Sequence, residues 1–425
     1  MDYKETLDYI SSINWKGSIL GLERINLLME KLGNPQKKLK FIHIAGTNGK
    51  GSTASFLSSV LVKAGYNTGL FTSPYIEVFN ERMQINNENI SDEELAEITS
   101  YIRPFADSMG DKPTEFELNT AISLVYFAKN KCDIVVFEVG MGGALDSTNV
   151  IDSPEVAVIT AIGLDHTEEL GDTIEKIAAT KSGIIKEGTS VVVYDQVGSV
   201  KEVINKRCNE FNAKMFVSEP DKVVFKDVDI DALHFSYKAF DELTIPLIGS
   251  YQLNNVAVAL KVIEVLKEKG WNISDKNIIE GLKETKWPGR FEVLRKNPAF
   301  IVDGAHNPHG IKATSESIKT VFDEQLKKGE KLTFVFGVMA DKDYMDMLSQ
   351  ITPMAKEFLC VTPDNPRALK ADELAKIIEN MGVKATAFDS IGSAIDKAFD
   401  LGNNCIALGS LYMIGDIKKY IKNKN

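Results

Sequence analysis

Cysteine and histidine are scarce in this chain, and that scarcity limits the kinds of site it can hold. The 425 residues include four cysteines and five histidines. The cysteines are too far apart for the short spacings of zinc sites or for a disulfide framework. We expect them to be core thiols of a protein in a reducing compartment. They are Cys132, Cys208, Cys360 and Cys405.

Long apolar runs and an excess of positive charge are also missing. No stretch approaches the roughly 20 apolar residues of a membrane helix, and the segment 1–5 has neither the basic cluster nor the apolar run of a secretion signal. The chain has 49 basic and 60 acidic residues, a net charge of −11. That charge disfavours nucleic acids and anionic membranes as partners. We therefore expect a cytoplasmic protein with no membrane or nucleic-acid partner, in which local basic residues hold any anionic substrate.

Apolar runs alternate with helical patterns along the first half of the chain, which predicts a doubly wound, mainly parallel α/β sheet. The predicted strands are 41–44, 68–71, 134–139, 156–162 and 190–194. Short alternating strands between 223 and 248 predict a small antiparallel addition, and helices are expected at 251–269 and 276–284. Because a chain of this length exceeds one core, at least two domains are expected.

A tight break at 287–290, Trp-Pro-Gly-Arg, precedes a second alternation of strands and helices. Its predicted strands are 300–303, 332–336, 358–361, 385–388 and 405–408. This pattern predicts a second, Rossmann-like α/β domain. The expected division is a domain at 1–290, of P-loop type because of the glycine-rich turn at 46–53, and a C-terminal α/β domain at 291–425.

A glycine-rich turn after the first strand is the most informative stretch of the sequence. It runs Gly46-Thr47-Asn48-Gly49-Lys50-Gly51-Ser52-Thr53. Such a loop can aim backbone N–H groups at phosphate oxygens, while Lys50 supplies a cation and Ser52 a hydroxyl for Mg²⁺. An ordinary strand-to-helix turn is the alternative. Because Gly51 separates Lys50 from Ser52, the spacing departs from that of GTPases and kinases and favours another class of ATPase.

Further polar residues follow the predicted strands, at the edge where open α/β sheets bind ligands. Glu138 precedes a run of glycines and would suit Mg²⁺ on a nucleotide, although a loop acid of this kind can also be merely solvated. His166 and Ser73 stand at the ends of other strands of the same sheet. In the second half, Asp303 and His306 form a polar turn before Asn307-Pro308, which has the pattern of a helix N-cap.

Ten motifs in order resemble the folylpolyglutamate synthase and dihydrofolate synthase family, relatives of the Mur ligases, and they span nearly the whole chain. They are the glycine-rich loop, Ser73-Pro74, Glu138 to Gly143, Leu145 to Val150, Leu164 to His166, Lys181 to Ile184, Tyr251 to Asn254, Trp287 to Arg290, Asp303 to Pro308 and Gly409 to Tyr412.

The resemblance implies ATP-dependent amide formation. A folate carboxylate attacks the γ-phosphate, ADP leaves, and the amine of L-glutamate displaces phosphate from the acyl phosphate. Phosphorylation is needed because a carboxylate is a poor acylating agent, and loop N–H groups, Lys50 and Mg²⁺ stabilise the transferring charge. The expected substrates are ATP, a reduced folate and L-glutamate, and the expected state is a monomer.

The resemblance also implies roles for individual residues. Ser52 and Glu138 would hold one Mg²⁺, with Ser73, Glu138 and His166 around a second, and Lys181 would be carbamylated. The remaining implied contacts are Asn254 and Arg290 with adenine and phosphate, Asp303 with ribose, Asp146 and Ser147 with the acceptor, and His306 and Ser410 with glutamate or the acyl phosphate. Lys50, Lys181, His166 and His306 are the expected catalytic residues.

Two departures from the family pattern leave open which substrate accepts the glutamate, called the acceptor below. Many members have Arg and Ala where this chain has Ala144 and Ser147, in a loop that shapes the pterin end of the site. The sequence therefore favours a folylpolyglutamate synthase, with a bifunctional enzyme that also makes dihydrofolate as the alternative. A Mur-type ligase of cell-wall precursors is disfavoured by the short segment before the loop, and a nucleotide switch without turnover is a third alternative.

Overall fold

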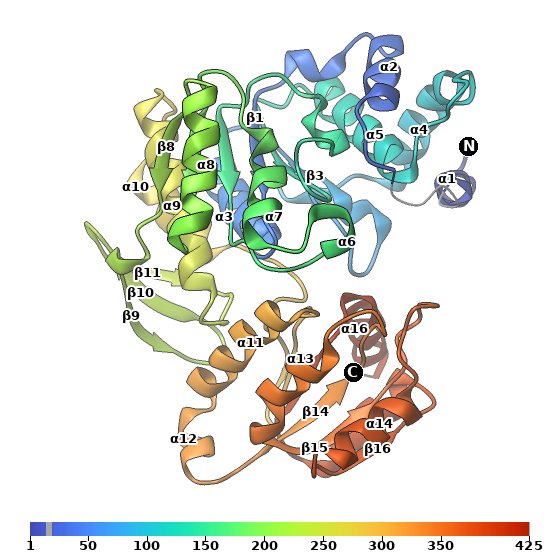
Figure 1. Cartoon of the computed structure of the whole chain (residues 1–425), viewed down its shortest axis with the longest axis vertical. Helices are drawn as coiled ribbons and strands as arrows, with labels where there is room; N and C mark the ends of the chain where they lie inside the picture. Colours follow the sequence, from blue (N-terminus) through green and yellow to red (C-terminus); the bar gives the residue numbers. More distant parts are fainter. Residues whose placement is uncertain (14–18, 425) are drawn as a thin grey trace. The chain divides into compact units, whose positions relative to one another are not determined.

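The structure is a computed structural model that describes residues 1–13 and 19–424 (Figure 1). Its contacts divide the chain into two compact units. The first comprises Met1–Lys222 and Asn254–Glu284, and the second comprises Val223–Leu253 and the chain from Thr285 onward.

The first unit is built on a sheet that has eight strands among the described residues, in the order β4-β3-β2-β5-β1-β6-β7-β8. Strands β2, β5, β1, β6, β7 and β8 are parallel, whereas β3 and β4 extend the β2 edge in antiparallel fashion. The strands are β1 (Phe41–Ala45), β2 (Thr68–Phe71), β3 (Met83–Ile85), β4 (Glu88–Asn89), β5 (Ile134–Glu138), β6 (Val156–Ile159), β7 (Ser190–Val193) and β8 (Lys214–Val217).

Helices cover both faces of this sheet, so that the central strands are buried on both sides and read as continuous apolar runs. On one face α5, α7 and α8 pack against the strands, while α3 lies on the other face against α10 (Figure 1). The helices are α1 (Tyr3–Ser12), α2 (Glu23–Lys31), α3 (Lys50–Lys63), α4 (Asp92–Asp107), α5 (Glu115–Lys129), α6 (Thr167–Leu170), α7 (Ile174–Lys181), α8 (Gly198–Glu210), α9 (Gln252–Glu268) and α10 (Asp275–Lys283).

The doubly wound, mainly parallel sheet predicted from the sequence is confirmed, with two kinds of difference. The short strands β3, β4 and β8 were not predicted. The predicted strand 156–162 ends early, at Ile159, because the following residues turn aside and Ala161 forms an isolated bridge with Asn48 of the glycine-rich loop.

A small antiparallel sheet, β11-β10-β9, confirms the predicted antiparallel addition. Its strands are β9 (Val223–Val228), β10 (Leu233–Tyr237) and β11 (Phe240–Ile245). Val228, and Ile230 just after it, pack against the core of the second unit, and the contacts group this sheet with that unit. The division into domains at 290 and 291 remains a prediction.

The second unit contains a sheet with six strands among the described residues, in the order β12-β13-β17-β14-β15-β16. All its pairings are parallel except that of β12 with β13. The strands are β12 (Glu292–Lys296), β13 (Ala299–Val302), β14 (Leu332–Phe336), β15 (Ala355–Cys360), β16 (Ala385–Ala387) and β17 (Cys405–Leu408). The predicted Rossmann-like sheet is confirmed, and β12 is an unpredicted edge strand.

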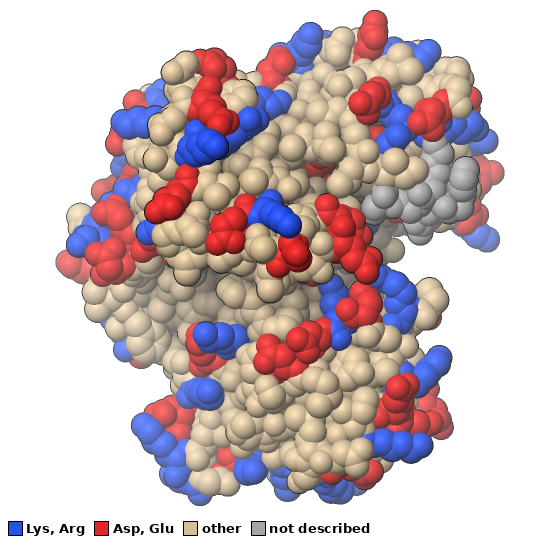
Figure 2. Space-filling model, viewed as in Figure 1, with Lys and Arg blue, Asp and Glu red and all other residues tan. Residues whose placement is uncertain are grey.

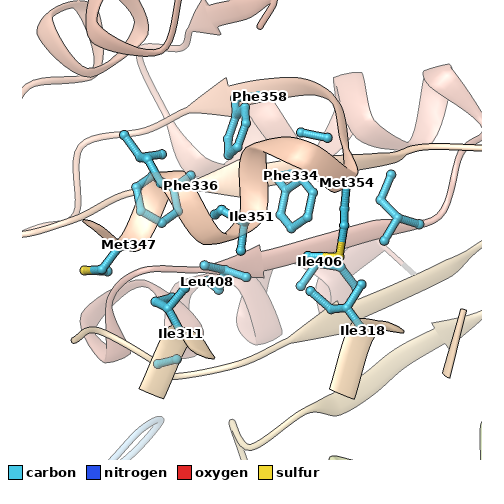
Figure 3. Packing of buried hydrophobic residues seen from close by; sticks show 14 of the residues in the cluster. Ile311, Ile318, Phe334, Phe336, Met347, Ile351, Met354, Phe358, Ile406 and Leu408 are labelled. Atoms are coloured by element: carbon cyan, nitrogen blue, oxygen red, sulfur yellow. The ribbon is translucent and has the colours of Figure 1, made fainter. Parts of the chain in front are cut away.

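Aromatic rings from β14 and β15 fill the core of this sheet (Figure 3). The rings of Phe334 and Phe358 stack with their centroids 5.2 Å apart, in the same core as Ile311 and Ile318 of α11. The helices of the unit are α11 (Pro308–Val321), α12 (Asp323–Lys327), α13 (Tyr344–Ile351), α14 (Ala371–Asn380), α15 (Ile391–Leu401) and α16 (Ile414–Lys424).

Three expectations from composition can be compared with the structure. All four cysteines are buried free thiols, as predicted. No helix in the described part of the chain is long and apolar enough to span a membrane. Basic and acidic side chains are interspersed over the face seen in Figure 2, so this face shows no broad basic patch.

Candidate active site

The glycine-rich loop connects β1 to α3, and two of its glycines are required by their surroundings. A Cβ atom on Gly46 would lie 1.8 Å from Oγ1 of Thr160. Gly49 has φ of +85° and is the N-cap of α3, which begins at Lys50. The loop therefore presents the N-terminus of a helix at the carboxyl end of a central strand, where the helix dipole favours an anion.

The end of the neighbouring strand β6 supports this loop. The N–H groups of Thr47 and Asn48 both donate to the carbonyl of Ala161, at 2.8 and 3.2 Å. The hydroxyl of Thr47 donates to the carbonyl of Gly163 at 3.0 Å. Strand β6 pairs with β1 in parallel, and these bonds from its end give the loop a defined shape.

Lys50, Glu138 and Ser73 come together at this edge of the sheet. Lys50 Nζ lies 3.8 Å from Glu138 Oε1 and 3.4 Å from the carbonyl of Thr47. The backbone N–H of Ser73 donates to Glu138 Oε2 at 3.4 Å. Glu138 is buried, and so is Ser52 in the first turn of α3. Three of the sequence-predicted phosphate and metal residues, Lys50, Ser73 and Glu138, thus share one strand-end cluster.

His166 follows β6 on the connection to α6, where it is exposed and has φ of +49°. Within residues 1–13 and 19–424, no three His, Cys, Asp or Glu side chains gather closely enough to hold a metal ion. Mg²⁺ is commonly bound by one or two carboxylates together with substrate phosphates and water. The cluster around Glu138 fits a nucleotide-bound Mg²⁺ rather than a cage made by the protein alone.

Lys181, at the C-terminus of α7, is buried against the glycine-rich loop 46–53, which is called the phosphate loop below. Its Nζ donates to the carbonyl of Gly46 at 2.8 Å, and 5% of the residue is exposed. Burial, reinforced by the positive charge of Lys50, lowers the pKa of Lys181 from 10.5 to about 7. A surface lysine, the default interpretation of a lysine at a helix end, is thereby excluded, and a large neutral fraction of the amine exists near pH 7.

The loop that carries Asp146 and Ser147 packs on the residues around Lys181. A Cβ atom on Gly143 would lie 2.7 Å from the carbonyl oxygen of Lys181. The hydroxyl of Ser147 is 2.9 Å from that of Thr120. Both loop residues are buried, and burial raises the pKa of Asp146 although several hydrogen bonds to its carboxylate oppose that rise.

Asn255 is a residue that the sequence analysis missed. The sequence prediction names Asn254, which is half-buried, whereas Asn255 is buried, and a Cβ atom on Gly49 would lie 2.4 Å from its Oδ1. The sequence held one signal for this position. Asn255 lies three residues after Gln252, and two polar residues at i and i+3 share a helix face, which indicates a polar face on this helix. Both Gln252 and Asn255 are buried on α9.

In the second unit, Asp303 follows β13 and both of its carboxylate oxygens are fully engaged. Oδ2 accepts hydrogen bonds from the Tyr251 hydroxyl and the Phe291 N–H, each at 2.8 Å. Oδ1 accepts from the Ala305 N–H at 2.8 Å and the Thr314 hydroxyl at 2.9 Å. Four donors fill the four acceptor positions of a carboxylate, so Asp303 fixes the turn in which it lies.

The structure places Arg290 and His306 around Gly304. A Cβ atom on Gly304 would lie 2.2 Å from an Arg290 guanidinium nitrogen, and His306 Nδ1 donates to the carbonyl of Gly304 at 2.8 Å. Asn307 caps α11, as predicted, by accepting the N–H of Gly310. Ser410 is buried, and its Oγ accepts the N–H of Tyr412 at 3.2 Å.

Comparisons with known proteins agree with this architecture. The Mur ligase middle domain matches residues 44–263, and the Mur ligase glutamate ligase domain matches residues 289–405. A dihydrofolate synthase/folylpolyglutamate synthase of Bacillus subtilis is 40% identical over 418 residues, covering 95% of each chain. A folylpolyglutamate synthase of Lacticaseibacillus casei is 34% identical over 435 residues, covering 99% of this chain and 98% of its own.

A solved folylpolyglutamate synthase complex with AMPPCP and folate is 32% identical, covers 99% of each chain and has a TM-score of 0.83. The matched domains, these relatives and the strand-end cluster on the phosphate loop lead to one conclusion. The chain is an ATP-dependent ligase that belongs to the folylpolyglutamate synthase/dihydrofolate synthase family of Mur-type ligases.

Proposed function

We propose that this chain adds L-glutamate to the γ-carboxylate of a reduced folate, using ATP, through an acyl-phosphate intermediate. The carboxylate oxygen attacks the γ-phosphorus and ADP leaves with the bonding electron pair. The glutamate amine then attacks the acyl carbon, inorganic phosphate leaves, and the amine loses a proton to give the amide. The phosphate loop with Lys50 at its centre carries the proposal.

Lys50 is suited to phosphoryl transfer because its contacts are long enough to be exchanged. Its ammonium lies 3.4 Å from a carbonyl and 3.8 Å from a carboxylate oxygen. A terminal phosphate beside it would gain a shorter, charge-assisted contact, which strengthens as charge develops on the transferring group. Because the N–H groups of Thr47 and Asn48 are bonded to Ala161, the backbone N–H groups at the N-terminus of α3 would share the remaining phosphate oxygens.

The protein side chains also fit Mg²⁺ on the nucleotide. Ser52 and Glu138 would hold one ion, and Ser73, Glu138 and His166 would contribute to a second. When bound, Mg²⁺ neutralises phosphate charge and makes the γ-phosphorus a better electrophile. Glu138 supports this proposal because its carboxylate is buried beside the phosphate loop, with Lys50 and the Ser73 N–H as neighbours.

Carbamylation of Lys181 is proposed for the same edge of the site. A neutral lysine amine attacks CO₂ and loses one proton, which gives an N-carboxylate with a negative charge. The lowered pKa of Lys181, about 7, supplies the neutral amine, and the added carboxylate would offset the positive charge of Lys50. Carbamylation is tested by ¹³C NMR after addition of ¹³C-bicarbonate, with Lys181→Met as the control that loses the signal.

From the second unit, Arg290 and Asp303 are proposed to contact nucleotide phosphate and ribose, and His306 and Ser410 to place glutamate or the acyl phosphate. His306 supports this role because donation from Nδ1 to the Gly304 carbonyl fixes the orientation of its ring in the polar turn. Asn254 is proposed to contact adenine. Asn255 should be substituted in parallel with it, because Asn255 is buried and lies beside Gly49 of the glycine-rich loop.

The experiment that tests the function is ATP- and Mg²⁺-dependent incorporation of labelled L-glutamate, run in parallel with tetrahydrofolate and with dihydropteroate. Incorporation with tetrahydrofolate supports the proposal. Incorporation with neither acceptor overturns it and leaves the cell-wall ligase and the nucleotide switch. A switch would hydrolyse ATP without requiring glutamate.

A bifunctional enzyme is the second candidate, and a specific observation favours it. The relative that is 40% identical to this chain carries both names, dihydrofolate synthase and folylpolyglutamate synthase. Incorporation of glutamate with both acceptors would establish this candidate. Incorporation with tetrahydrofolate alone would connect Ala144 and Ser147 with the loss of dihydropteroate as a substrate.

We also propose that the protein acts as a cytoplasmic monomer without a nucleic-acid partner. The four free, buried cysteines support a reducing compartment. The net charge of −11 and the interspersed charges on the face in Figure 2 give no electrostatic attraction for a polyanion. Light scattering at micromolar concentration tests the oligomeric state.

A further inference from the structure

His43 is a buried titratable residue to which the proposed reaction gives no role. It lies in the middle of β1, the strand that leads into the phosphate loop, and none of it is exposed. Its ring centroid is 6.0 Å from that of Phe137. Burial, together with the nearby charge of Lys186, lowers the pKa of His43 to about 3, so the imidazole is neutral.

The hydrogen bonds around His43 fix which ring nitrogen carries the proton. The Thr148 hydroxyl lies 2.9 Å from His43 Nε2 and also bonds to Asp146 Oδ1. Asp146 Oδ1 accepts the Thr148 N–H at 3.0 Å as well, so it acts as an acceptor and the hydroxyl donates to it. The hydroxyl oxygen must therefore accept a hydrogen bond from His43 Nε2–H.

This tautomer leaves His43 Nδ1 with a lone pair and no hydrogen-bond partner among the described residues. A buried unpaired acceptor costs free energy, and an apolar ring or a leucine would fill similar space without that cost. The donor at Nε2 therefore explains the presence of an imidazole at this position. Its effect is to orient the Thr148 hydroxyl towards Asp146.

Asp146 in turn connects the loop with the strand that carries Glu138. Its Oδ2 accepts the N–H of Met141 at 2.8 Å, three residues after Glu138. At the far end of the loop, Lys186 Nζ donates to the carbonyls of Asn149 and Ile151. The 3₁₀ turn η4 (Ser147–Val150) is thus held from β1, from the end of β5 and from Lys186.

We propose that His43 is a positioning residue that, through the Thr148 hydroxyl, holds Asp146 and the loop 143–150 in the shape that binds the acceptor substrate. The proposal rests on the proposed function, because it takes this loop to face the pterin end of the acceptor. It predicts an effect on acceptor binding that is separate from any effect on ATP.

Thr148→Val tests the proposal because it removes the hydroxyl and keeps the shape of the side chain. We expect the KM for tetrahydrofolate to rise about tenfold, the loss of roughly one buried hydrogen bond, and the KM for ATP to change by less than about twofold. Thr148→Ser should restore the acceptor KM. His43→Leu should act like Thr148→Val, and His43→Gln, which keeps an N–H donor, should act less strongly.

The matched control is Thr99→Val in α4. Thr99 is also fully buried, and its hydroxyl donates to the Leu95 carbonyl of its own helix. It should leave both KM values unchanged. If Thr148→Val changes the KM values for acceptor, ATP and glutamate by the same factor, or changes none of them, the positioning role is wrong.

A second measurement keeps the proposal testable if the ligase activity itself is not found. ¹⁵N NMR of histidine side chains in the whole protein should show one ring in the Nε2–H form whose signals do not titrate between pH 5 and 9 and disappear in His43→Gln. In Thr148→Val, the Nε2 proton should exchange faster with solvent. An Nδ1–H tautomer, or a ring that titrates near its ordinary pKa, would overturn the network whatever the activity.

Discussion

Lys50 and Asp303 both follow a buried β-strand at a glycine-containing turn, yet their surroundings differ in kind. The ammonium of Lys50 has contacts of 3.4 and 3.8 Å. The carboxylate of Asp303 accepts four hydrogen bonds of 2.8 to 2.9 Å. A charge with long contacts can exchange them for a ligand at little cost, whereas a charge with a full set of short bonds determines the shape of its turn.

This difference bears on the role proposed for Asp303. If ribose is to bind the carboxylate, one of its four donors must yield its place. We therefore expect changes at Lys50 mainly to reduce catalysis, and changes at Asp303 mainly to reduce the stability of the second unit. Two further predictions concern the effect of surroundings on one residue type. One is the stability cost of burying the Lys181 ammonium, and the other compares two glycines that have similar backbone conformations but different neighbours.

The largest effect is expected for Lys50→Met. Loss of the cation should lower turnover about a thousandfold, because it removes a donor that acts on developing phosphate charge. Thermal unfolding should change little, since the contacts that are lost are long. Lys63→Met is the matched control, at the other end of α3, where Lys63 pairs with Glu284 at 2.7 Å. Turnover near the wild-type value in Lys50→Met would contradict the comparison.

Asp303→Ala is expected to lower the free energy of unfolding of the second unit by about 3 kcal/mol, because several buried hydrogen-bond donors lose their acceptor. Denaturant unfolding followed by the fluorescence of Trp287 measures this loss, with the other two tryptophans replaced by phenylalanine. The exposed Asp364→Ala serves as the control and should cost less than about 0.5 kcal/mol. An Asp303→Ala protein of unchanged stability and reduced ATP affinity would instead make Asp303 mainly a ligand-binding residue.

Lys181→Met should stabilise the protein at pH 6 by on the order of 2 kcal/mol, because a buried ammonium is removed. The folded-state pKa of Lys181 is about 7, below its ordinary 10.5. Between these values the unfolded chain binds more protons, so wild-type stability rises with pH. The advantage of Lys181→Met should therefore shrink as the pH rises from 7 towards 10. Unfolding in bicarbonate-free buffer tests this, and a difference independent of pH would contradict it.

The smallest effects are expected for alanine at Gly49 and at Gly65, two variants that separate the cost of backbone strain from that of a steric contact. Gly49 and Gly65 have φ of +85° and +87°, but only at Gly49 does a neighbour, Asn255, occupy the place of a Cβ atom. Both alanine variants should lose about 1 kcal/mol from the left-handed conformation. Gly49→Ala should in addition lower the ATP affinity, because the loop must shift. Equal ATP affinities in the two variants would show that Asn255 simply moves aside.

The elements that could be predicted from the sequence are those whose signals are local. The run 41–44 followed by a glycine-rich turn predicted β1 and the phosphate loop, and Glu138 could be placed beside it because parallel strands end at the same edge of a sheet. Asn307 before Pro308 predicted the start of α11. The strand β8 was missed because Lys214–Val217 is short and begins with an exposed lysine.

The residues that could not be predicted depend on contacts between distant parts of the chain. Lys181 resembles a surface lysine in sequence, and its burial arises from Gly46 and from the packing of Gly143 against its backbone. The four donors to Asp303 come from positions 251 to 314. The role of His43 became visible only when Thr148, 105 positions later, was placed beside it.

The proposed reaction requires ATP to phosphorylate the acceptor carboxylate before the amide forms. It is tested most directly with tetrahydrofolate carrying ¹⁸O in both oxygens of the γ-carboxylate, together with ATP, Mg²⁺ and L-glutamate. An acyl phosphate requires one ¹⁸O to leave with inorganic phosphate and the other to remain in the amide. Transfer of one label to phosphate for each glutamate added is the predicted result, and amide formation with unlabelled phosphate would contradict the account.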